Sequence, residues 1–591
     1  MAVNKVVLGD STLIDLTSDT VTEEDVVQGK IFHKANGEQV EGTLDPNAGG
    51  GGTSKDENET VNFHDYDGTL LHSFSLEEIQ AMTELPPLPT QPGLICQGWN
   101  WSLEDIKDHN RALDIGATYI TDDGKTRLYI SVDGLLTATL SYEQSNSEGV
   151  IIDWGDGSST TTTSLYNYLL KHTYASAGDY VITLDPVGSC QLNLGGGAKN
   201  VIGIHNGNSP TSTTYAHANM LVKVELGRNV ILGRSAFYYC ESLETATIPN
   251  GITRFNGAEF MQSKRLKGLV IPNGVKSING RTLYYCCALS FVSIPNGMKS
   301  MVSDAFGNNY ALKSVTFPNS MQTVNSFADY TSLKRISLPD GITACPRLAA
   351  TPISSIKLPN SLTQIDGSSF DNCKALSSIE IPEAVTSIDA YAFQNCYALW
   401  KVRVPSNVTS IGNYAFDGCK GLTSVEFPNG LITIGQYAFQ YCYSLTSVKI
   451  PNTVTSIGAY AFRGCTGISS IKIPSIVTSL GKYAFNKCNT LLRVELQEGL
   501  KTIGDYAFSD CVSMTSIKIP SSVTSIGTLA FGSWYNAKYY DFTSHTSVPT
   551  LTNASTFYLG EDTEIRVPAA LYDEWIAATN WSSNADYIVA V

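Results

Sequence analysis

Residues 376–398 read LSSIEIPEAVTSIDAYAFQNCYA, and close variants of this segment recur through the C-terminal half of the chain. Ile379 and Ile381 alternate with polar residues, a pattern that predicts a short strand with one buried face. Pro382 ends the strand because proline has no N–H to donate to a sheet ladder. The chain then returns to the interior with Val385, Ile388, Ala392, Phe393 and Cys396. One unit cannot enclose these apolar side chains but stacked units can, so the segment predicts a solenoid.

The repeat has a period of 23 residues, which is clearest in its prolines. One series comprises Pro249, Pro272, Pro295 and Pro318, and a second comprises Pro382, Pro405, Pro428, Pro451 and Pro474. Gln497 takes the next place and Pro520 ends the series. Between the two series, shorter units lead to Pro339 and Pro359, Cys345 is out of phase, and Pro346 and Pro352 interrupt the pattern. We expect a local kink or a change of curvature there.

Cysteines and glycines keep the same period. Seven of the thirteen cysteines fall 23 residues apart, namely Cys373, Cys396, Cys419, Cys442, Cys465, Cys488 and Cys511. A residue that repeats with the structural unit is most simply a small buried core residue, and the chain has no CxxC pair or Cys/His cluster with zinc spacing. A turn in the later coils carries Gly412, Gly435, Gly458, Gly481, Gly504 and Gly527, where we expect a positive φ.

The consensus IPxxVTSIGxYAFxxCxxLTSVxI resembles the BspA-like (LRR_5, Treponema-type) leucine-rich repeats over residues 222–535. The resemblance implies a leucine-rich-repeat solenoid in a surface-exposed recognition protein, whose ligands differ from one member to another.

Two ladders of exposed side chains follow from the repeat. The charged ladder on the strands is Glu380, Arg403, Glu426, Lys449, Lys472, Glu495 and Lys518. Its mixed signs favour a role in solubility and strand register. The second ladder is Tyr391, Tyr414, Tyr437, Tyr460, Tyr483 and Tyr506. Tyrosines bind sugars or protein partners, but they also form half-buried packing between coils. The candidate ligand-binding surface comprises these tyrosines with the strand-face serines Ser424, Ser447 and Ser470.

The region before the repeats reads as small β-rich modules. VTEEDVVQGKIFHKANGEQVEGT, within residues 1–46, contains Asn36-Gly37 as a hairpin signal and resembles an N-terminal module of phage tail and minor structural proteins. Residues 47–57 form a Gly/Ser and charged linker of the flexible type. Residues 58–123 include ETVNFHDYDGTLLHSFSLEEIQAMTELPPLPTQPGLICQGWNW and a stretch near DIGATYITDDGKTRLYI, and this region also resembles a module of phage structural proteins. The resemblance implies attachment of the chain to other tail proteins.

Residues 64–70, HDYDGTL, imitate the DxDGT nucleophile motif of haloacid-dehalogenase-type phosphatases through Asp65, Asp67 and Thr69. That chemistry requires an apolar strand before the motif and a doubly wound α/β domain after it. ETVNFH precedes the motif here, and one short helix, a Pro-rich turn and β-type sequence follow it. We therefore expect no catalysis at this motif.

Residues 124–190 resemble a PKD-type β-sandwich. The resemblance rests on Trp154-Gly155-Asp156-Gly157, His172-Thr173-Tyr174 and Gly178-Asp179-Tyr180 ahead of VITL. Asp153 and Asp156 are too few for a calcium site and predict hydrogen bonds within a tight turn. Residues 191–221 are expected to enter the solenoid, and residues 536–591 to cover its last coil, with a helix after Pro568 and a closing strand in DYIVAV.

Composition narrows the function further. The chain of 591 residues has a formal charge of −16 and only 16% charged residues, which argues against nucleic acid as a partner. No apolar run reaches the ~18 residues that a membrane-spanning helix needs. The beginning, MAVNKVVLGDSTLIDL, does not read as a secretory signal.

These features predict a mainly β, non-enzymatic protein without cofactor or metal. The favoured interpretation is a phage or prophage tail fibre, assembled in the host cytoplasm and placed on the virion tail. Its repeats would bind a bacterial surface glycan or protein, and it would form a homo-oligomer, a trimer being one possibility. The alternative is a BspA-like adhesin on a bacterial surface.

Overall fold

The computed structural model describes residues 5–8, 11–15, 31–33, 39–41 and 60–591, except 135, 196–199, 203–218, 303 and 325. The chain divides into two compact units, Met1–Glu57 and Asn58–Val591. In the first unit, β1 (Lys5–Leu8) pairs antiparallel with β2 (Ser11–Asp15), and β3 (Ile31–His33) with β4 (Gln39–Glu41). The β3–β4 pair brackets Asn36-Gly37 as a hairpin requires. The turn itself, the predicted linker and most of the predicted 1–46 module lie outside the described residues.

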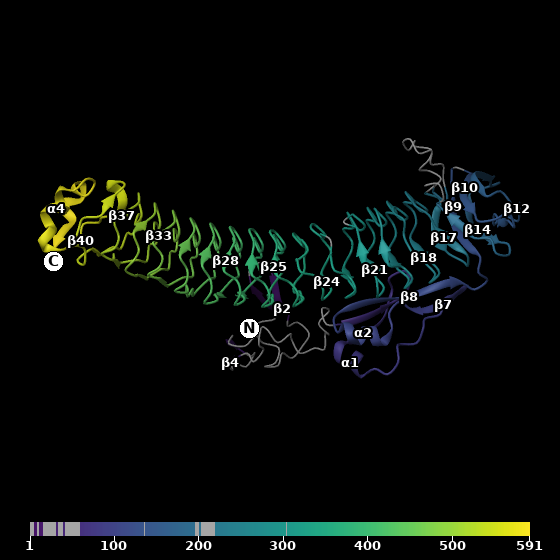
Figure 1. The fold of residues 1–591 in the computed structure, drawn as a ribbon, viewed down its shortest axis with the longest axis horizontal. Helices are drawn as coiled ribbons and strands as arrows, with labels where there is room; N and C mark the ends of the chain where they lie inside the picture. The colour runs from purple at the N-terminus through teal and green to yellow at the C-terminus, as the bar shows by residue number, and fades with distance from the viewer. Residues whose placement is uncertain are drawn as a thin grey trace. The chain divides into compact units, whose positions relative to one another are not determined.

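The second unit contains the predicted solenoid, which we call the repeat array (Figure 1). Most coils contribute one short strand before the proline and a second strand after it, a few have only an isolated bridge at one of these places, and equivalent strands pair in parallel. In the first coils the strands after the prolines, β20 (Ser277–Ile278) and β22 (Ser300–Met301), form a pair of their own. From Gln364 onward they form one nine-stranded sheet: β25 (Gln364–Ile365), β26 (Ser387–Ile388), β28 (Ser410–Ile411), β30 (Thr433–Ile434), β31 (Ser456–Ile457), β33 (Ser479–Leu480), β35 (Thr502–Ile503), β37 (Ser525–Ile526) and β39 (Thr550–Leu551). The mainly β solenoid predicted from the sequence is confirmed.

The strands before the prolines form the other side of each coil, which we call the strand face. They are β18 (Thr245–Thr247), β19 (Gly268–Val270), β21 (Phe291–Ser293), β23 (Ser314–Thr316), β24 (Arg335–Ser337), β27 (Lys401–Arg403), β29 (Ser424–Glu426), β32 (Ser470–Ile473), β34 (Arg493–Leu496), β36 (Ser516–Lys518) and β38 (Tyr539–Asp541). Gln497 shows why most of them have three residues. Gln497 has an N–H where its equivalents are prolines, so the ladder between β32 and β34 can continue one residue further. These two strands pair with each other and have four residues each.

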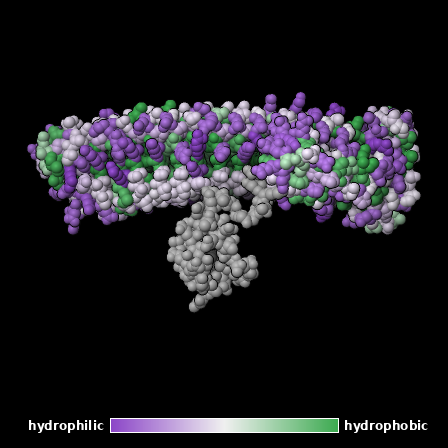
Figure 2. Space-filling model, turned by 90° about the horizontal axis from the view of Figure 1, so that it is seen from below, coloured by the Kyte–Doolittle hydropathy of each residue, from purple (hydrophilic) through white to green (hydrophobic). Residues whose placement is uncertain are grey.

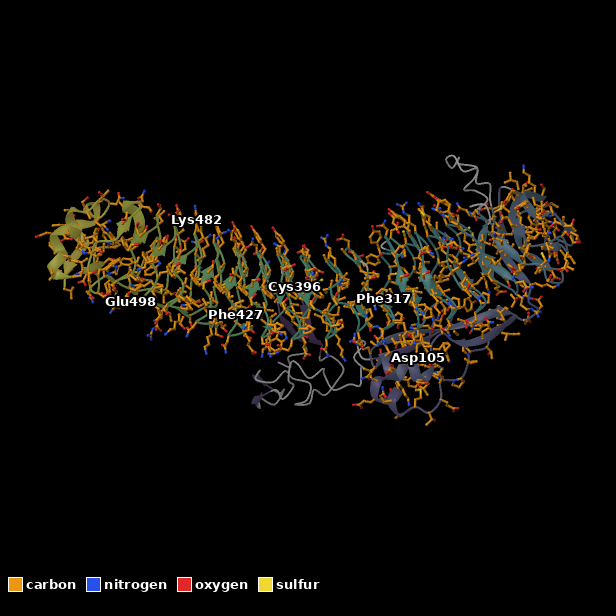
Figure 3. All side chains as sticks on the ribbon, in the orientation of Figure 1. Asp105, Phe317, Cys396, Phe427, Lys482 and Glu498 are labelled. Atoms are coloured by element: carbon orange, nitrogen blue, oxygen red, sulfur yellow. The ribbon has the colours of Figure 1, made fainter. Side chains whose placement is uncertain are left out.

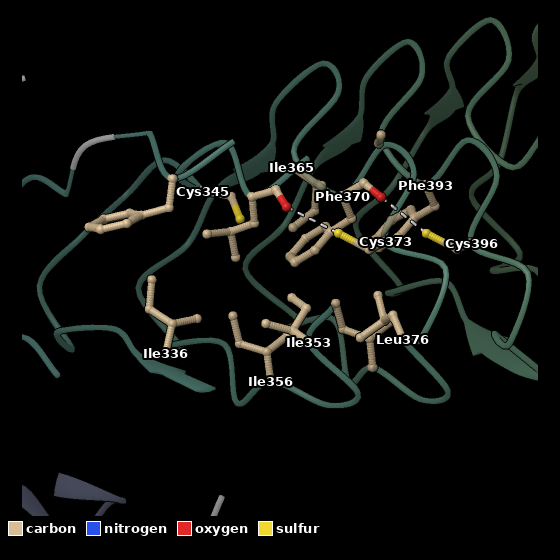
Figure 4. Packing of buried hydrophobic residues seen from close by; sticks show 14 of the residues in the cluster. Ile336, Cys345, Ile353, Ile356, Ile365, Phe370, Cys373, Leu376, Phe393 and Cys396 are labelled. Atoms are coloured by element: carbon tan, nitrogen blue, oxygen red, sulfur yellow. Dashed lines mark hydrogen bonds between the residues drawn. The ribbon is translucent and has the colours of Figure 1, made fainter. Parts of the chain in front are cut away.

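The interior of the array is a set of columns in which equivalent side chains stack. Phe370, Phe393, Phe416, Phe439, Phe462, Phe485, Phe508 and Phe531 form one column, with neighbouring ring centroids 5.2–6.0 Å apart and rings within 7° of parallel. The short coils between the two proline series also have a continuous apolar core. Cys345, Ile353 and Ile356 are buried in the same core (Figure 4). A changed curvature at these coils stays a prediction.

The repeating cysteines are buried, as predicted, and each also makes a hydrogen bond between coils. Cys396 Sγ donates to the carbonyl of Phe370 at 3.1 Å (Figure 4), and later cysteines do the same at 3.1–3.3 Å. Coils without the cysteine supply another donor there: Ser263 to Phe237 O, Asn309 to Leu283 O, and Trp534 Nε1 to Phe508 O. Burial raises the pKa of Cys488 to about 12, so the thiol keeps the proton that it donates.

Two substitutions at Cys442 separate packing from hydrogen bonding. Cys442→Ala removes the donor to Phe416 O and should destabilise the array by about 1–3 kcal/mol. Cys442→Ser keeps a donor, as Ser263 does, and should cost less than Cys442→Ala. Urea unfolding followed by circular dichroism measures both. Equal losses for the two variants would show that the hydrogen bond contributes nothing.

The repeating glycines were predicted to need a positive φ, and this prediction is wrong. None of Gly412, Gly435, Gly458, Gly481, Gly504 and Gly527 has a positive φ. Each lies against the backbone of the preceding coil, where a Cβ atom would come within 2.4–2.7 Å of a backbone atom. The positive φ falls two residues later, at the ladder tyrosines, whose φ values are 55–63°. Close approach of coils, rather than turn conformation, requires these glycines.

Gly458→Ala should therefore push two coils apart and cost about 1–3 kcal/mol. Its Cβ would lie 2.6 Å from Gln436 N, which is backbone and has little freedom to move. Gly430→Ala is the matched control, because its nearest neighbour, Ser406 O, would be 3.6 Å away. Differential scanning calorimetry should show a lower unfolding temperature for the first variant alone.

The N-terminal end of the array is covered by a β-sandwich. Its six-stranded sheet has the order β12 (Ser159–Thr162), β11 (Val150–Asp153), β14 (Gly178–Pro186), β9 (Thr126–Val132), β16 (Leu221–Glu225) and β18. The four-stranded sheet has the order β13 (Tyr166–Thr173), β10 (Thr137–Gln144), β15 (Leu192–Leu194) and β17 (Val230–Leu232). Because β16, β17 and β18 belong to the first coils, both sheets continue into the array and share its core.

At the other end, β38 pairs in parallel with β40 (Glu564–Val567), and β40 with the closing strand β41 (Ile588–Ala590). A short helix, α4 (Tyr572–Ala577), lies between them in sequence and buries Trp575. No helix in the described part of the chain has the length and apolar character needed to cross a membrane.

Candidate binding surface

A small domain, residues 60–121, packs on the strand face of the first coils (Figure 1); we call it the docked module. Its sheet has the order β6 (Leu70–Ser75), β5 (Thr60–His64), β8 (Leu113–Thr121) and β7 (Leu94–Trp99), with helices α1 (Leu76–Ala81) and α2 (Leu103–His109). Strand β8 contacts β18, β19, β21 and β23. The fit is close: a Cβ atom at Gly116 of β8 would come within 2.3 Å of Val270.

Side chains of the docked module donate to carbonyls that the prolines leave without a partner. Ile271 donates its N–H to Ser293 O, so the next donor in the parallel ladder would be Pro295, which has no N–H. Asn100 Nδ2 donates to the Ile271 carbonyl at 3.1 Å. Trp101 Nε1 donates to Ile294 O at 2.8 Å, and Arg111 to Leu338 O, both at the same place before a proline. The docking contacts thus use a feature that the repeat itself creates.

A buried ion pair fixes the docked module to the array. The guanidinium of Arg335 contacts the carboxylate of Asp114, and His64 Nε2 lies 3.3 Å from the same carboxylate. Burial alone would raise the pKa of Asp114, but Arg335 and the hydrogen bond from His64 outweigh it and hold that pKa well below its ordinary value. Asp114 is therefore ionised, and the pair depends on both partners.

The phosphatase-like motif lies within this interface as a turn. It joins β5 to the antiparallel β6, which is a hairpin rather than the strand-to-helix edge of a doubly wound domain. Asp65 accepts hydrogen bonds from Gln91 Nε2 and the Tyr66 N–H, and Asp67 from the Thr69 N–H. Both acidic side chains thus accept hydrogen bonds that stabilise the turn and its contact with Gln91.

His109 gives the docked module a dependence on pH. Burial, together with Arg111, lowers the pKa of His109 to about 4, and its ring packs 5.3 Å from that of Trp101. The unfolded chain takes up the proton near pH 6.5 and the folded chain only near 4. Stability is therefore full above pH 6.5 and should fall by about 3 kcal/mol as the pH is lowered to 4. Hydrogen exchange of α2 measures this, and His109→Phe should remove the dependence.

Beyond the docked module the strand face is open, and its composition changes. The residue two before each proline is buried under the module at Thr247, Val270, Ser293, Thr316 and Ser337. From Lys357 onward that position is charged and at least partly exposed, which includes all members of the predicted charged ladder. Lys472 pairs with Glu495 at 2.7 Å, and Lys401 pairs with Glu426 at 2.8 Å. Figure 2 shows rows of hydrophilic residues along the array with a hydrophobic band between them.

The six predicted tyrosines form one continuous stack. Successive ring centroids are 4.4–4.9 Å apart and the rings lie within 15° of parallel. Lys482 places its ammonium over Tyr483 and Tyr506. Partial burial and the neighbouring Tyr437 raise the pKa of Tyr414. The ring faces contact one another, and Tyr391, at the start of the stack, is the most open at 40% exposure.

The structure does not bring the predicted serines to this stack. Ser424 and Ser470 lie on β29 and β32 of the strand face, and Ser447 bridges Ser424 in parallel. In Figure 3, Lys482 lies at one edge of the array, and Phe427 and Glu498, near the strand ends, lie at the opposite edge. The tyrosines and the serines therefore belong to two separate surfaces.

Two further features bear on the site. In the sandwich, Asp153 accepts from the Gly155 N–H and Asp156 from the Ser158 N–H and from His172, as the turn prediction requires. The described residues contain no group of three or more His, Cys, Asp and Glu side chains suited to a metal ion.

One exposed aromatic residue, Trp400, was not predicted from the sequence as part of a binding surface, and it is 39% exposed. Its signal is that Ser377 and Thr423 hold the equivalent positions in the adjacent coils.

A family model described as the BspA type leucine-rich repeat region matches residues 230–349, 347–469 and 432–558. Among solved structures, a leucine-rich repeat protein from Bacteroides ovatus is 21% identical, with a TM-score of 0.47, over 63% of this chain and 94% of that one. A leucine-rich cell surface protein from Faecalibacterium prausnitzii is 26% identical, with a TM-score of 0.33, over 50% and 86%. The pneumococcal vaccine antigen PcpA is 16% identical, with a TM-score of 0.34, over 58% and 85%. No curated protein sequence matches the chain.

Proposed function

The chain belongs to the BspA-type leucine-rich repeat family, and we propose that it is a non-enzymatic recognition protein displayed on a bacterial surface, where its repeat array attaches to a glycan or protein. The observation that carries the proposal is the open strand face from Lys357 to Lys518. It is a long, regular surface with a charged side chain in each coil, supported by a closely packed core, which is what an attachment protein needs and a catalyst does not.

Display and attachment are tested separately. Brief protease treatment of intact producing cells should remove the protein, whereas a cytoplasmic marker should survive. Beads coated with the full chain should bind target cells, and free chain should compete with the beads. Protection from protease on intact cells, or beads that bind no cell type, would contradict the adhesin role.

A second candidate, a phage tail fibre, is supported by the resemblance of residues 1–46 and 58–123 to phage structural modules and of residues 124–190 to a PKD domain. The module at residues 1–46 would dock on other tail proteins, as a homo-oligomer. Gold-labelled antibody on purified particles and on intact cells separates the candidates, because the label should appear on tails in one case and on cell envelopes in the other.

A further inference from the structure

Trp400 is the exposed tryptophan of this chain. Of its seven tryptophans, the other six are at most 7% exposed, whereas Trp400 is 39% exposed. It lies in the turn before β27 and makes no ring contact within the described part of the chain. Its backbone is held by both neighbours, through Trp400 N to Ser377 O at 3.2 Å and Thr423 N to Trp400 O at 2.8 Å. Packing does not require this indole ring, since serine and threonine suffice in the adjacent coils.

The turn that leads to Trp400 is stacked between two turns that each carry a lysine, as the bonds from Ala398 N to Lys374 O and from Gly421 N to Tyr397 O show. Tyr397, in the same turn, lies below two ammonium groups: Lys374 of the preceding coil at 5.6 Å from its ring centroid, and Lys420 of the following coil at 4.5 Å. Neither lysine forms an ion pair in the part of the chain that the structure describes. The basic residues of the adjoining strand, Lys401 and Arg403, are in contrast neutralised by Glu426 and Glu383.

We propose that Trp400, Tyr397, Lys374 and Lys420 form a binding site for an acidic saccharide. The apolar C–H face of a sugar ring would lie on the indole, and its carboxylate or phosphate would be held by the two ammonium groups. The two ammonium groups are at most about 10 Å apart, because they lie 5.6 Å and 4.5 Å from the same Tyr397 ring centroid. That spacing suits a polymer with one anion for every one or two sugar units. The inference rests on the proposed attachment function and names its ligand class.

Two other classes of partner fit the site less well. A protein partner anchored on tryptophan would favour an apolar surround, and Trp400 instead has Ser377 and Thr423 beside it and lysines nearby. A nucleic acid carries a phosphate on every nucleotide along a continuous backbone, and proteins that bind it follow that backbone with a longer basic surface than two lysines supply. A saccharide with sparse charge needs two cations, which is what the site offers. The tyrosine stack fits the same ligand poorly, because its ring faces are already engaged with one another.

The test uses isothermal titration of the full chain with four probes: polygalacturonate for carboxylates, phosphomannan for phosphates, dextran as a neutral glycan, and oligothymidylate. At least one acidic polymer should bind, and the relative affinities of the first two identify the anion. Trp400→Thr, which restores the residue type of the adjacent coils, should weaken binding about tenfold or more, and so should Lys374→Gln with Lys420→Gln. The control is Leu492→Thr, at the equivalent position of a coil without the lysine pair, and it should change nothing.

Several outcomes would overturn the inference: binding of dextran or oligothymidylate as tight as that of the acidic polymers, no binding of either acidic polymer, or full binding by Trp400→Thr. The cell-binding assay with the same variants keeps the two proposals apart. If no acidic polymer binds while beads still attach to cells, the saccharide site is wrong and the attachment function stands. If the polymers bind at Trp400 while no cell is bound, the site stands and the attachment function is wrong.

Discussion

Replacing Arg335 by alanine should destabilise the docked module by about 3–5 kcal/mol, because it leaves the carboxylate of Asp114 buried without its main counter-charge. Arg335 also donates to the carbonyl of Thr60 at 3.1 Å, so the variant loses a second contact with the module. Hydrogen exchange of β5 and β8 should rise by orders of magnitude, while exchange in the later coils stays unchanged.

The control for this variant is Lys472→Ala, which removes an exposed ion pair with Glu495 and should cost less than about 1 kcal/mol. The double variant Arg335→Met with Asp114→Asn removes both charges and should recover much of the loss. Unchanged protection of β8 in Arg335→Ala would show that shape alone holds the docked module in place.

Replacing Phe439 by alanine should cost about 3–5 kcal/mol, since it opens a gap in the middle of the phenylalanine column. The ring is fully buried between Phe416 at 5.2 Å and Phe462 at 5.4 Å, with Phe427 against its edge at 5.5 Å. Because coils contact mainly their neighbours, the variant should unfold in two steps, one for the coils on each side of residue 439. The unmodified array should unfold in a single step.

Urea titration with circular dichroism measures this effect. Tyr443→Ala, four residues away with a ring that is 44% exposed, is the matched control and should shift the midpoint little. An equal loss for the two substitutions would mean that the column contributes no more than an exposed ring does.

The sequence predicts the solenoid because its apolar residues, prolines and cysteines share one period, and a shared period leaves few alternative folds. It also predicts the buried cysteines, but not their hydrogen bonds, although Ser263, Asn309 and Trp534 all place a donor at the same position. The prediction of a positive φ at the glycines is wrong because a close backbone approach and a positive φ both select glycine. The positive φ of the ladder tyrosines could not be predicted from the sequence, since bulky residues are uncommon in that conformation.

The docked module could not be placed from the sequence. Its contacts join residues about 190 positions apart, such as Asn100 and Ser293. One signal was present: the residue two before each proline is uncharged from Thr247 to Ser337 and charged from Lys357 onward. That change marks where a covered surface ends. Trp400 gave a similar signal, as a large residue at a position where the adjacent coils have small ones.

The parallel pairing of equivalent strands has a mechanical consequence. Hydrogen bonds between coils run along the stack, so a pull on the two ends of the array loads them lengthwise and in series rather than all at once. Coils should then detach singly, each releasing 23 residues, or about 80 Å of extended chain. A chain of this kind lengthens in steps under load, and each step dissipates part of the applied work.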